Sequence, residues 1–205
     1  MSGNLLSDWL EAFEGDRARE RGALARLLHD ETGGSLTAAG IELTLLRMDL
    51  PVEYAERLDA LERSLDHAFS AVRAASLLAS PDLASRMSLA DALSRMAEAL
   101  GRRFAGTLAL SIDTEYRPDA ETAQGLFRIA ECLTAYLSAE VGATSVELEV
   151  EAGPVLTLPA NRGVTREEAA CALGPTLARY WAAKTNLRFL FGNPDAGSTM
   201  FVIRR

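Results

Sequence analysis

Cysteine, histidine and long apolar runs are scarce in this sequence of 205 residues. Its two cysteines, Cys132 and Cys171, lie far apart, which argues against a disulfide framework or a zinc site. We expect both to be small buried residues of the core. No run approaches the roughly 18 apolar residues of a membrane-spanning helix, and the N-terminus lacks the pattern of a signal peptide. The sequence therefore predicts a cytoplasmic protein.

Positive charge is also in short supply. The chain has 21 basic and 29 acidic residues, a net charge of -8, which argues against binding to nucleic acid or to an acidic membrane surface. A protein partner suits this balance better. With 48% hydrophobic and 24% charged residues, the composition is that of a globular chain with one large or two small domains.

The segment from residue 24 to 50 has the apolar periodicity of one long helix. At 100° per residue its apolar side chains keep one phase from Leu24 to Leu50, although Gly33 and Gly34 lie between them. The alternative is that Gly33 ends one helix and Ser35 begins another. The unbroken phase favours a continuous helix.

Pro51 should end this helix, and residues 52–79 carry a second one with heptad spacing. Its predicted seam consists of Leu58, Leu61, Leu65, Ala68, Val72, Ala75 and Ala79. Two helices joined by a short turn form an antiparallel hairpin, but one hairpin leaves Ile41, Leu45, Phe69 and Leu77 to be covered. We therefore expect a homodimer in which two hairpins form a four-helix bundle.

The remaining sequence alternates between strand and helix patterns. Residues 79–88 read as a linker, and Ser88 is the expected N-cap of a helix to about residue 103. Strands are expected at 107–113, 145–152, 155–160, 187–193 and 199–205, the last two as a hairpin, with helices at 119–140 and 165–183. The predicted fold class is α+β, with a helical hairpin domain at 1–82 and a sheet domain at 88–205.

His29 is the main candidate for chemistry. It lies at the margin of the apolar stripe, with Asp30 next to it and with glycines and Arg26 nearby. Small neighbours allow another protein to approach closely, and the adjacent carboxylate can accept a hydrogen bond from one ring nitrogen while the other acts as nucleophile. Such a histidine can accept a phosphoryl group, although a lone His-Asp pair is more often an ordinary surface feature. We interpret His67, beside the seam, as structural.

The segment ARLLHDETGGSLTAAGIELTLL resembles the phosphoacceptor helix of two-component sensor histidine kinases whose motif reads L-H-D-x-x-G-Q-x-L-T-A. The resemblance continues through the second helix and into the kinase ATPase domain. It implies that His29 is the phosphoacceptor, that Asp30 orients it, and that the second domain is an ATPase-like α/β sandwich. In family members that dephosphorylate their regulator, a glutamine stands where this chain has Gly34, so the resemblance does not support phosphatase activity.

The second domain departs from the family at each motif that binds ATP. Where the family has a Glu and an Asn for Mg²⁺ and phosphates, this chain has Cys132 and Tyr136, or Glu131 and Ala135 if the alignment shifts by one residue. The family sequence D-x-G-x-G is reduced to Gly163, with Ala160 and Asn161 before it, and the glycine-rich lid is reduced to Gly174 followed by Pro175. Loss of all three motifs predicts that ATP is not bound usefully.

Three functions remain open. The first is a histidine phosphotransferase that takes a phosphoryl group onto His29 from the phospho-aspartate of a response regulator and passes it on; it binds no cofactor, and Mg²⁺ comes with the regulator. The second is a stand-alone kinase with a divergent pocket, and the third is a non-catalytic module that docks on a kinase or regulator. Whether the chain is an enzyme is therefore left open. Gly22, Arg26, Gly33 and Thr37 are candidate docking residues, because they share the His29 side of a straight helix.

Overall fold

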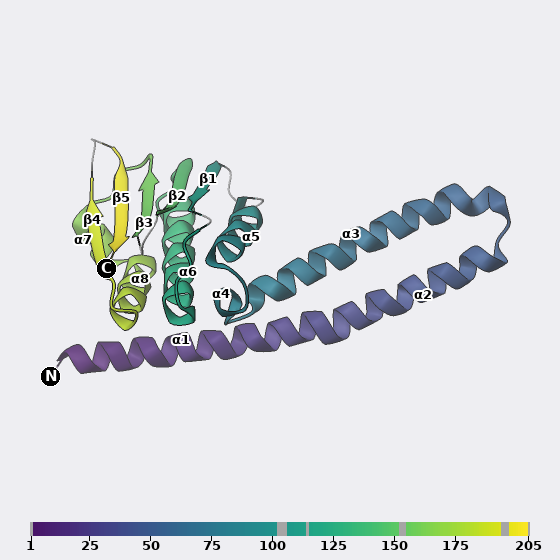
Figure 1. Ribbon diagram of the computed structural model, residues 1–205, viewed down its shortest axis with the longest axis horizontal. Coiled ribbons are helices and arrows are strands. Elements are labelled where there is room, and N and C mark those ends of the chain that lie inside the picture. The colour runs from purple at the N-terminus through teal and green to yellow at the C-terminus, as the bar shows by residue number, and fades with distance from the viewer. Residues whose placement is uncertain (1, 102–105, 114, 152–154, 194–196, 205) are drawn as a thin grey trace. The chain divides into compact units, whose positions relative to one another are not determined.

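The structure is a computed structural model that describes residues 2–101, 106–113, 115–151, 155–193 and 197–204. It has two compact units, Glu11–Pro81 and a second unit made of Met1–Leu10 and Asp82–Arg205 (Figure 1). The predicted domains at 1–82 and 88–205 stay predictions, because packing within one chain does not show which parts fold on their own.

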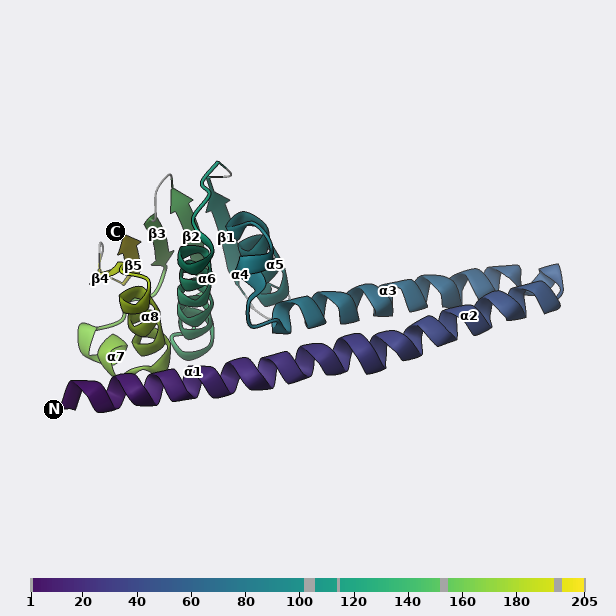
Figure 2. The ribbon, with the colours of Figure 1, turned by 60° about the horizontal axis from the view of Figure 1, so that its bottom comes forward.

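The first unit is a helical hairpin. Its first arm consists of α1 (Ser2–Arg26) from Glu11 onward, the π-helical segment η1 (Leu27–Thr32) and α2 (Gly33–Asp49). The backbone stays helical through Gly33 and Gly34, which confirms the predicted continuity. The chain becomes extended at Leu50 and Pro51, and the return arm consists of a 3₁₀ turn, η2 (Val52–Tyr54), and α3 (Ala55–Ala79). Both views show α2 and α3 running side by side (Figures 1 and 2).

Polar contacts at both ends fix how the arms of the hairpin align. Near the start of the hairpin, the Ser76 hydroxyl donates a hydrogen bond of 2.9 Å to the carbonyl oxygen of Ala25. Near the turn, the Arg47 guanidinium pairs with the carboxylates of Asp59 and Glu62. These contacts hold the two arms in one register over most of their length.

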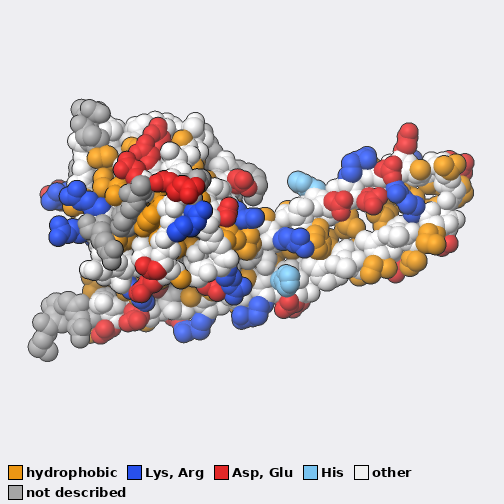
Figure 3. All heavy atoms as spheres, in the orientation of Figure 1, with side chains coloured by type: hydrophobic (Ala, Val, Ile, Leu, Met, Phe, Trp, Pro, Cys, Tyr) orange, Lys and Arg blue, Asp and Glu red, His pale blue; other side chains and the backbone are white. Residues whose placement is uncertain are grey.

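The hairpin has almost no core of its own. No residue of α2 is buried, and in α3 only Leu58 is. The expected uncovered residues Ile41 and Leu45 are exposed, whereas Phe69 and Leu77 are half-buried, and two of the seven seam residues, Leu61 and Ala75, are exposed. Hydrophobic side chains are visible along both arms (Figure 3). An isolated hairpin of this kind leaves an apolar surface in water.

The second unit contains a mixed five-stranded sheet in the order β1-β2-β3-β5-β4. Its strands are β1 (Thr107–Ile112), β2 (Ser145–Glu151), β3 (Val155–Ala160), β4 (Arg188–Gly192) and β5 (Thr199–Arg204). Only β1 and β2 are parallel, and α6 (Ala120–Ala135) with the π-helical segment η3 (Tyr136–Glu140) connects them. All five strands lie where the sequence predicts them, except that residues 152 and 205 fall outside the described residues.

Helices cover one face of this sheet (Figure 2). α5 (Leu89–Gly101) packs on β1, α6 on β3, and α8 (Leu173–Lys184) on β4. The alternation predicted from sequence is present, since every second residue of β2 and β3 is buried. Three helices begin at side-chain caps. The Ser88 hydroxyl accepts from the Asp91 amide before α5, Asp119 accepts from the Thr122 amide before α6, and Thr165 forms a capping box with Glu168 at the start of α7 (Arg166–Cys171). The predicted N-cap at Ser88 is confirmed.

Three expectations were wrong, and a fourth is not tested. The predicted linker contains a short helix, α4 (Leu83–Arg86), because Leu83 and Ala84 are buried. The predicted helix at 165–183 is two helices, α7 (Arg166–Cys171) and α8, separated by Ala172 in an extended conformation. Cys132 is buried as expected, but Cys171 is exposed. The helix from Ser88 was expected to reach about residue 103, and this end lies outside the described residues.

Candidate functional site

His29 lies at the centre of the π-helical segment η1. The amide of Gly33 donates to the carbonyl oxygen of Leu28, five residues earlier, instead of to the usual partner four residues earlier. His29, Asp30 and Glu31 are all exposed, so η1 presents three consecutive ionisable side chains to solvent. Single π turns occur often at functional sites, because the inserted residue re-aims its neighbours.

The expected pairing of Asp30 with His29 is not formed. Within the described part of the chain, neither side chain makes a hydrogen bond or ion pair. The Asp30 carboxylate therefore does not orient the imidazole here, and His29 is exposed to solvent. The imidazole is free to meet a group brought by a partner.

The π turn changes the predicted docking face. A π turn inserts one residue, so residues after 32 are rotated by about 100° relative to a straight α-helix. The shared face assumed for Gly22, Arg26, Gly33 and Thr37 is therefore wrong, although their docking roles remain untested. Arg26 and Thr37 are exposed, but Gly22 and Gly33 are half-buried, and the Thr37 hydroxyl donates to the Gly33 carbonyl oxygen at 2.8 Å. Gly34, which the prediction omitted, is exposed.

His67 differs from His29 in its helical setting. It is also exposed, which contradicts the expectation that it is structural. It lies within the regular α-helix α3, with no π turn and no glycine near it. His67 is therefore a useful internal control for any chemistry assigned to His29.

A separate cavity of about 510 Å³ lies in the sheet unit, beside η3 and the start of α7. Tyr136, Glu140, Arg162, Gly163 and Glu168 contribute to its wall. Burial raises the pKa of the Tyr136 hydroxyl, and the charges of Glu140 and Glu168 raise it further. Two carboxylates and one guanidinium contribute to this wall, and the excess of negative charge is unfavourable for a polyphosphate.

Comparison with known proteins connects the hairpin to a family. Residues 20–84 match the sequence model of the HisKA_3 family, described as histidine kinase. This match includes the end of α1, the π turn with His29, and all of α2 and α3. The hairpin is therefore similar to the corresponding domain of histidine kinases. This similarity supports a role in two-component signalling.

Several solved structures are similar to this chain. The histidine kinase domain of the blue-light activated kinase EL346 from Erythrobacter litoralis has a TM-score of 0.50 at 15% identity, over 83% of this chain and 94% of that chain. The longer EL346 structure gives 0.48 at 19% identity, over 73% of this chain and 61% of that one. The ATP binding domain of PrrB from Mycobacterium tuberculosis gives 0.45 at 22% identity, over 58% of this chain and 93% of that domain. The first likeness shows a shared fold. Comparison with curated proteins gives no match.

The structure confirms the predicted architecture of a helical hairpin followed by an ATPase-like α/β domain. The next question is whether the sheet unit can hold ATP. In the family an acidic residue at the end of the β3 equivalent reads adenine. Here the Asn161 carbonyl oxygen accepts hydrogen bonds of 3.0 Å from the amides of Thr144 and Ser145, and its amide nitrogen donates to the Thr144 hydroxyl at 2.7 Å. Asn161 joins β3 to β2, so its polar atoms are engaged within the protein.

The other residues that align with nucleotide-binding positions of the family also contact other parts of the sheet unit or are buried in it. The Glu131 carboxylate accepts a hydrogen bond of 2.8 Å from Arg128, and Cys132 is buried. Gly174, the remaining glycine of the lid, lies within α8, where a Cβ atom would be 2.7 Å from the Tyr136 Cβ and 3.0 Å from the Cys132 carbonyl oxygen. This glycine permits α8 to pack against α6 and forms no phosphate loop. The residues present do not fit ATP with Mg²⁺.

Two further results bear on ligands and membranes. Within the described residues, no cluster of three or more His, Cys, Asp or Glu side chains is placed to hold a metal ion. The helices of the described ranges include none that is long and apolar enough to cross a membrane.

The sequence alone pointed to His29 but missed the π turn and the hydrogen bonds of Asn161. The only sequence signal for the π turn was the pair of glycines, and the only signal for the Asn161 hydrogen bonds was the loss of the aspartate.

Proposed function

We propose that this protein is a histidine phosphotransferase of a two-component phosphorelay. His29 accepts a phosphoryl group from the phospho-aspartate of a response regulator and passes it to a second regulator. The observation that carries the proposal is a contrast between the two units: the His29 ring is exposed and unpaired, whereas the nucleotide positions of the sheet unit are engaged in internal packing.

The transfer needs little from the chain besides the imidazole. A neutral ring nitrogen attacks the phosphorus of the aspartyl phosphate, a nitrogen–phosphorus bond forms, and the bond from phosphorus to the carboxylate oxygen breaks. The regulator supplies Mg²⁺, and this chain binds no cofactor of its own. The protein acts as a phosphotransferase without ATP-dependent kinase activity.

The proposal includes a homodimer. α2 contributes no buried residue, and among its exposed apolar side chains Ile41 and Leu45 are 58% and 50% accessible. A second hairpin packed against these side chains would give the unit the core it lacks. Domains of this family typically dimerise and signal to response regulators. Response-regulator receiver domains are accordingly the proposed partners.

The test uses purified receiver domains labelled with ³²P at their aspartate. The full chain is incubated with each receiver and compared with His29→Ala and with His67→Ala as the matched control, since both histidines are exposed on hairpin helices. We expect label on the wild type and on His67→Ala, stable to alkali and lost in acid, and none on His29→Ala. A parallel incubation with γ-labelled ATP should give no label.

Other results would select the alternatives. Label taken directly from ATP would show a stand-alone kinase with a divergent pocket. Failure of every cognate receiver to label the wild type, together with a His29→Ala protein that keeps its cellular effect, would show a non-catalytic docking module. Label that persists on His29→Ala would refute the assignment of the phosphoacceptor.

A further inference from the structure

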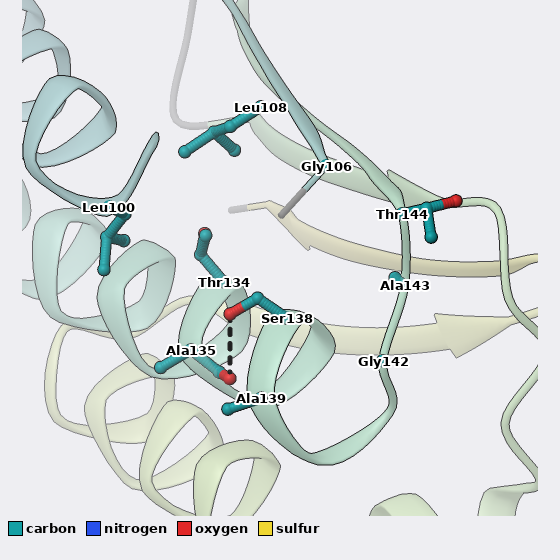
Figure 4. A pocket seen from close by; sticks show the side chains of 10 residues that line it. All are labelled: Leu100, Gly106, Leu108, Thr134, Ala135, Ser138, Ala139, Gly142, Ala143 and Thr144. Atoms are coloured by element: carbon teal, nitrogen blue, oxygen red, sulfur yellow. Dashed lines mark hydrogen bonds between the residues drawn. The ribbon is translucent and has the colours of Figure 1, made fainter. Parts of the chain in front are cut away.

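A second cavity of the sheet unit lies away from the nucleotide position. It measures about 440 Å³ and is enclosed by the end of α5, the start of β1, the last turns of α6 with η3, and the loop before β2 (Figure 4). Leu100 and Leu108 form one wall, and the small side chains of Ala135 and Ala139 form another. None of the described side chains that line the cavity carries a charge.

One buried hydroxyl in this cavity lacks a partner. Thr134 is 2% exposed, and its Oγ1 makes no hydrogen bond within the described residues. Figure 4 shows this hydroxyl pointing from α6 into the cavity. A buried polar group without a partner lowers stability, and such groups are few in native proteins. The unpaired Thr134 hydroxyl therefore calls for a partner that the described part of the chain does not supply.

The other hydroxyls of the wall are already engaged. The Ser138 hydroxyl donates to the carbonyl oxygen of Ala135 at 3.2 Å, as the dashed line in Figure 4 marks. The Thr144 hydroxyl accepts from the Asn161 amide at 2.7 Å. A ligand in this cavity would thus meet apolar walls and one hydrogen-bonding group, Thr134.

We propose that this cavity binds an uncharged, mainly apolar small molecule that forms one hydrogen bond with the Thr134 hydroxyl. Apolar walls with a few convergent polar groups are the usual composition of a small-molecule site. The volume is far larger than the roughly 30 Å³ that one water occupies, so a single water bound to Thr134 would leave most of the space empty. A charged ligand would find no counter-charge among the described residues of the wall.

This site is separate from the cavity at the nucleotide position. The two share no lining residue, although both border η3: Tyr136 and Glu140 line the nucleotide side, and Ser138 and Ala139 line this one. The proposed ligand is therefore no nucleotide, and its binding does not depend on whether His29 accepts a phosphoryl group.

The test uses benzyl alcohol and toluene as probes, because they have similar shapes and differ in the hydroxyl group. Each is titrated into the full chain carrying ¹³C-labelled Leu and Ala methyl groups. We expect both probes to shift the methyl resonances of Leu100, Leu108, Ala135 and Ala139. Benzyl alcohol should bind more tightly than toluene once the greater solubility of the alcohol in water is accounted for.

Three variants identify the site. Thr134→Val keeps the shape of the side chain and removes the hydroxyl, so it should weaken benzyl alcohol about five-fold and leave toluene unchanged. Without a probe, Thr134→Val should raise the melting temperature, because the unpaired hydroxyl is gone. Ala139→Phe fills the mouth from an exposed position and should abolish binding of both probes. Ala183→Phe, at an exposed alanine of α8 outside the cavity, should change neither.

Several results would overturn the proposal. One is that neither probe shifts the methyl resonances of the wall at its solubility limit. Another is binding that survives Ala139→Phe while Ala183→Phe behaves as the wild type, which would place the probes elsewhere. Equal loss of both probes in Thr134→Val would show that the hydroxyl makes no specific bond.

Discussion

Replacing Gly34 by alanine should make the hairpin more stable and phosphoryl transfer slower. Gly34 follows His29 by five residues and is exposed in α2. A Cβ atom built at this position meets no atom within 4 Å in the described structure. The fold of one chain therefore has no steric need for this glycine, and a requirement for glycine has to come from something that approaches the helix from outside.

The size of both effects follows from this geometry. Alanine in a helix interior is favoured over glycine by about 0.5–1 kcal/mol, and no clash at Gly34 offsets the gain. For a chain of this size the melting temperature should rise by about 1–4 °C. If a receiver domain approaches His29 closely, the added methyl group overpacks that contact by about 1–3 kcal/mol and slows transfer about five-fold or more.

Gly15→Ala is the matched control. Gly15 is also a helical glycine, in α1, and its Cβ meets no described atom within 4 Å, but it lies fourteen residues before His29. Thermal unfolding followed by circular dichroism should show the same gain for both variants, and transfer from a labelled receiver should fall only for Gly34→Ala. A Gly34→Ala protein that is more stable and transfers at the wild-type rate would refute the docking role of this glycine. A Gly34→Ala protein that is less stable than the wild type would refute the conclusion that a Cβ atom meets no clash at this position.

Three further predictions concern packing, assembly and pH. Gly174→Ala should lower the free energy of unfolding by about 1–3 kcal/mol in a urea titration, because its Cβ would overlap α6, whereas Gly101→Ala, which meets no described atom within 4 Å, should not. Ile41→Asp should shift the molar mass measured by light scattering from dimer to monomer, since a charge cannot be buried in the proposed bundle. Hydrogen bonds at the helix N-termini lower the pKa of Asp119 and of Glu168 from their ordinary values of 3.8 and 4.5. The stability that these two carboxylates contribute is therefore fully present above their ordinary pKa values. It is lost as the pH falls through the lowered pKa of the folded state. Urea titrations across this acid range should show a weaker pH dependence for Asp119→Asn; an unchanged dependence would refute the role of that cap.

The sequence predicted the elements better than their connections. Strands β2 and β3 alternate buried and exposed residues, a local pattern with a period of two, and they were found where expected. The break at Ala172 was missed because residues 165–183 carry a helical pattern on both sides of it. The short helix at Leu83 was missed because its helical state depends on burial against distant residues, which no local pattern records.

The candidate site divides in the same way. His29 and its paired glycines could be singled out from sequence, because their residue types and spacing are local properties. The π turn could not be predicted from sequence. It is a shift of one backbone hydrogen bond by one residue, and the apolar periodicity is compatible with a straight α-helix as well as with a helix that contains such a turn. The prediction assumed a straight helix with 100° per residue and therefore placed Gly33 and Thr37 on the same side as His29. In the structure Gly33 is half-buried, and the exposed glycine of this pair is Gly34.

By itself the sequence determined the long helices of the hairpin and the strands of the sheet that follows, and it singled out His29 as the candidate for phosphoryl transfer. Tertiary structure decided what the residues at the altered nucleotide motifs do: Asn161 joins two strands through residues sixteen and seventeen positions away, and Gly174 lets α8 approach Tyr136. It also created the cavity around Thr134. The physical reason is that hydrogen-bond partners and close packing are set by groups distant in the chain, whereas periodicity and capping are set by neighbours.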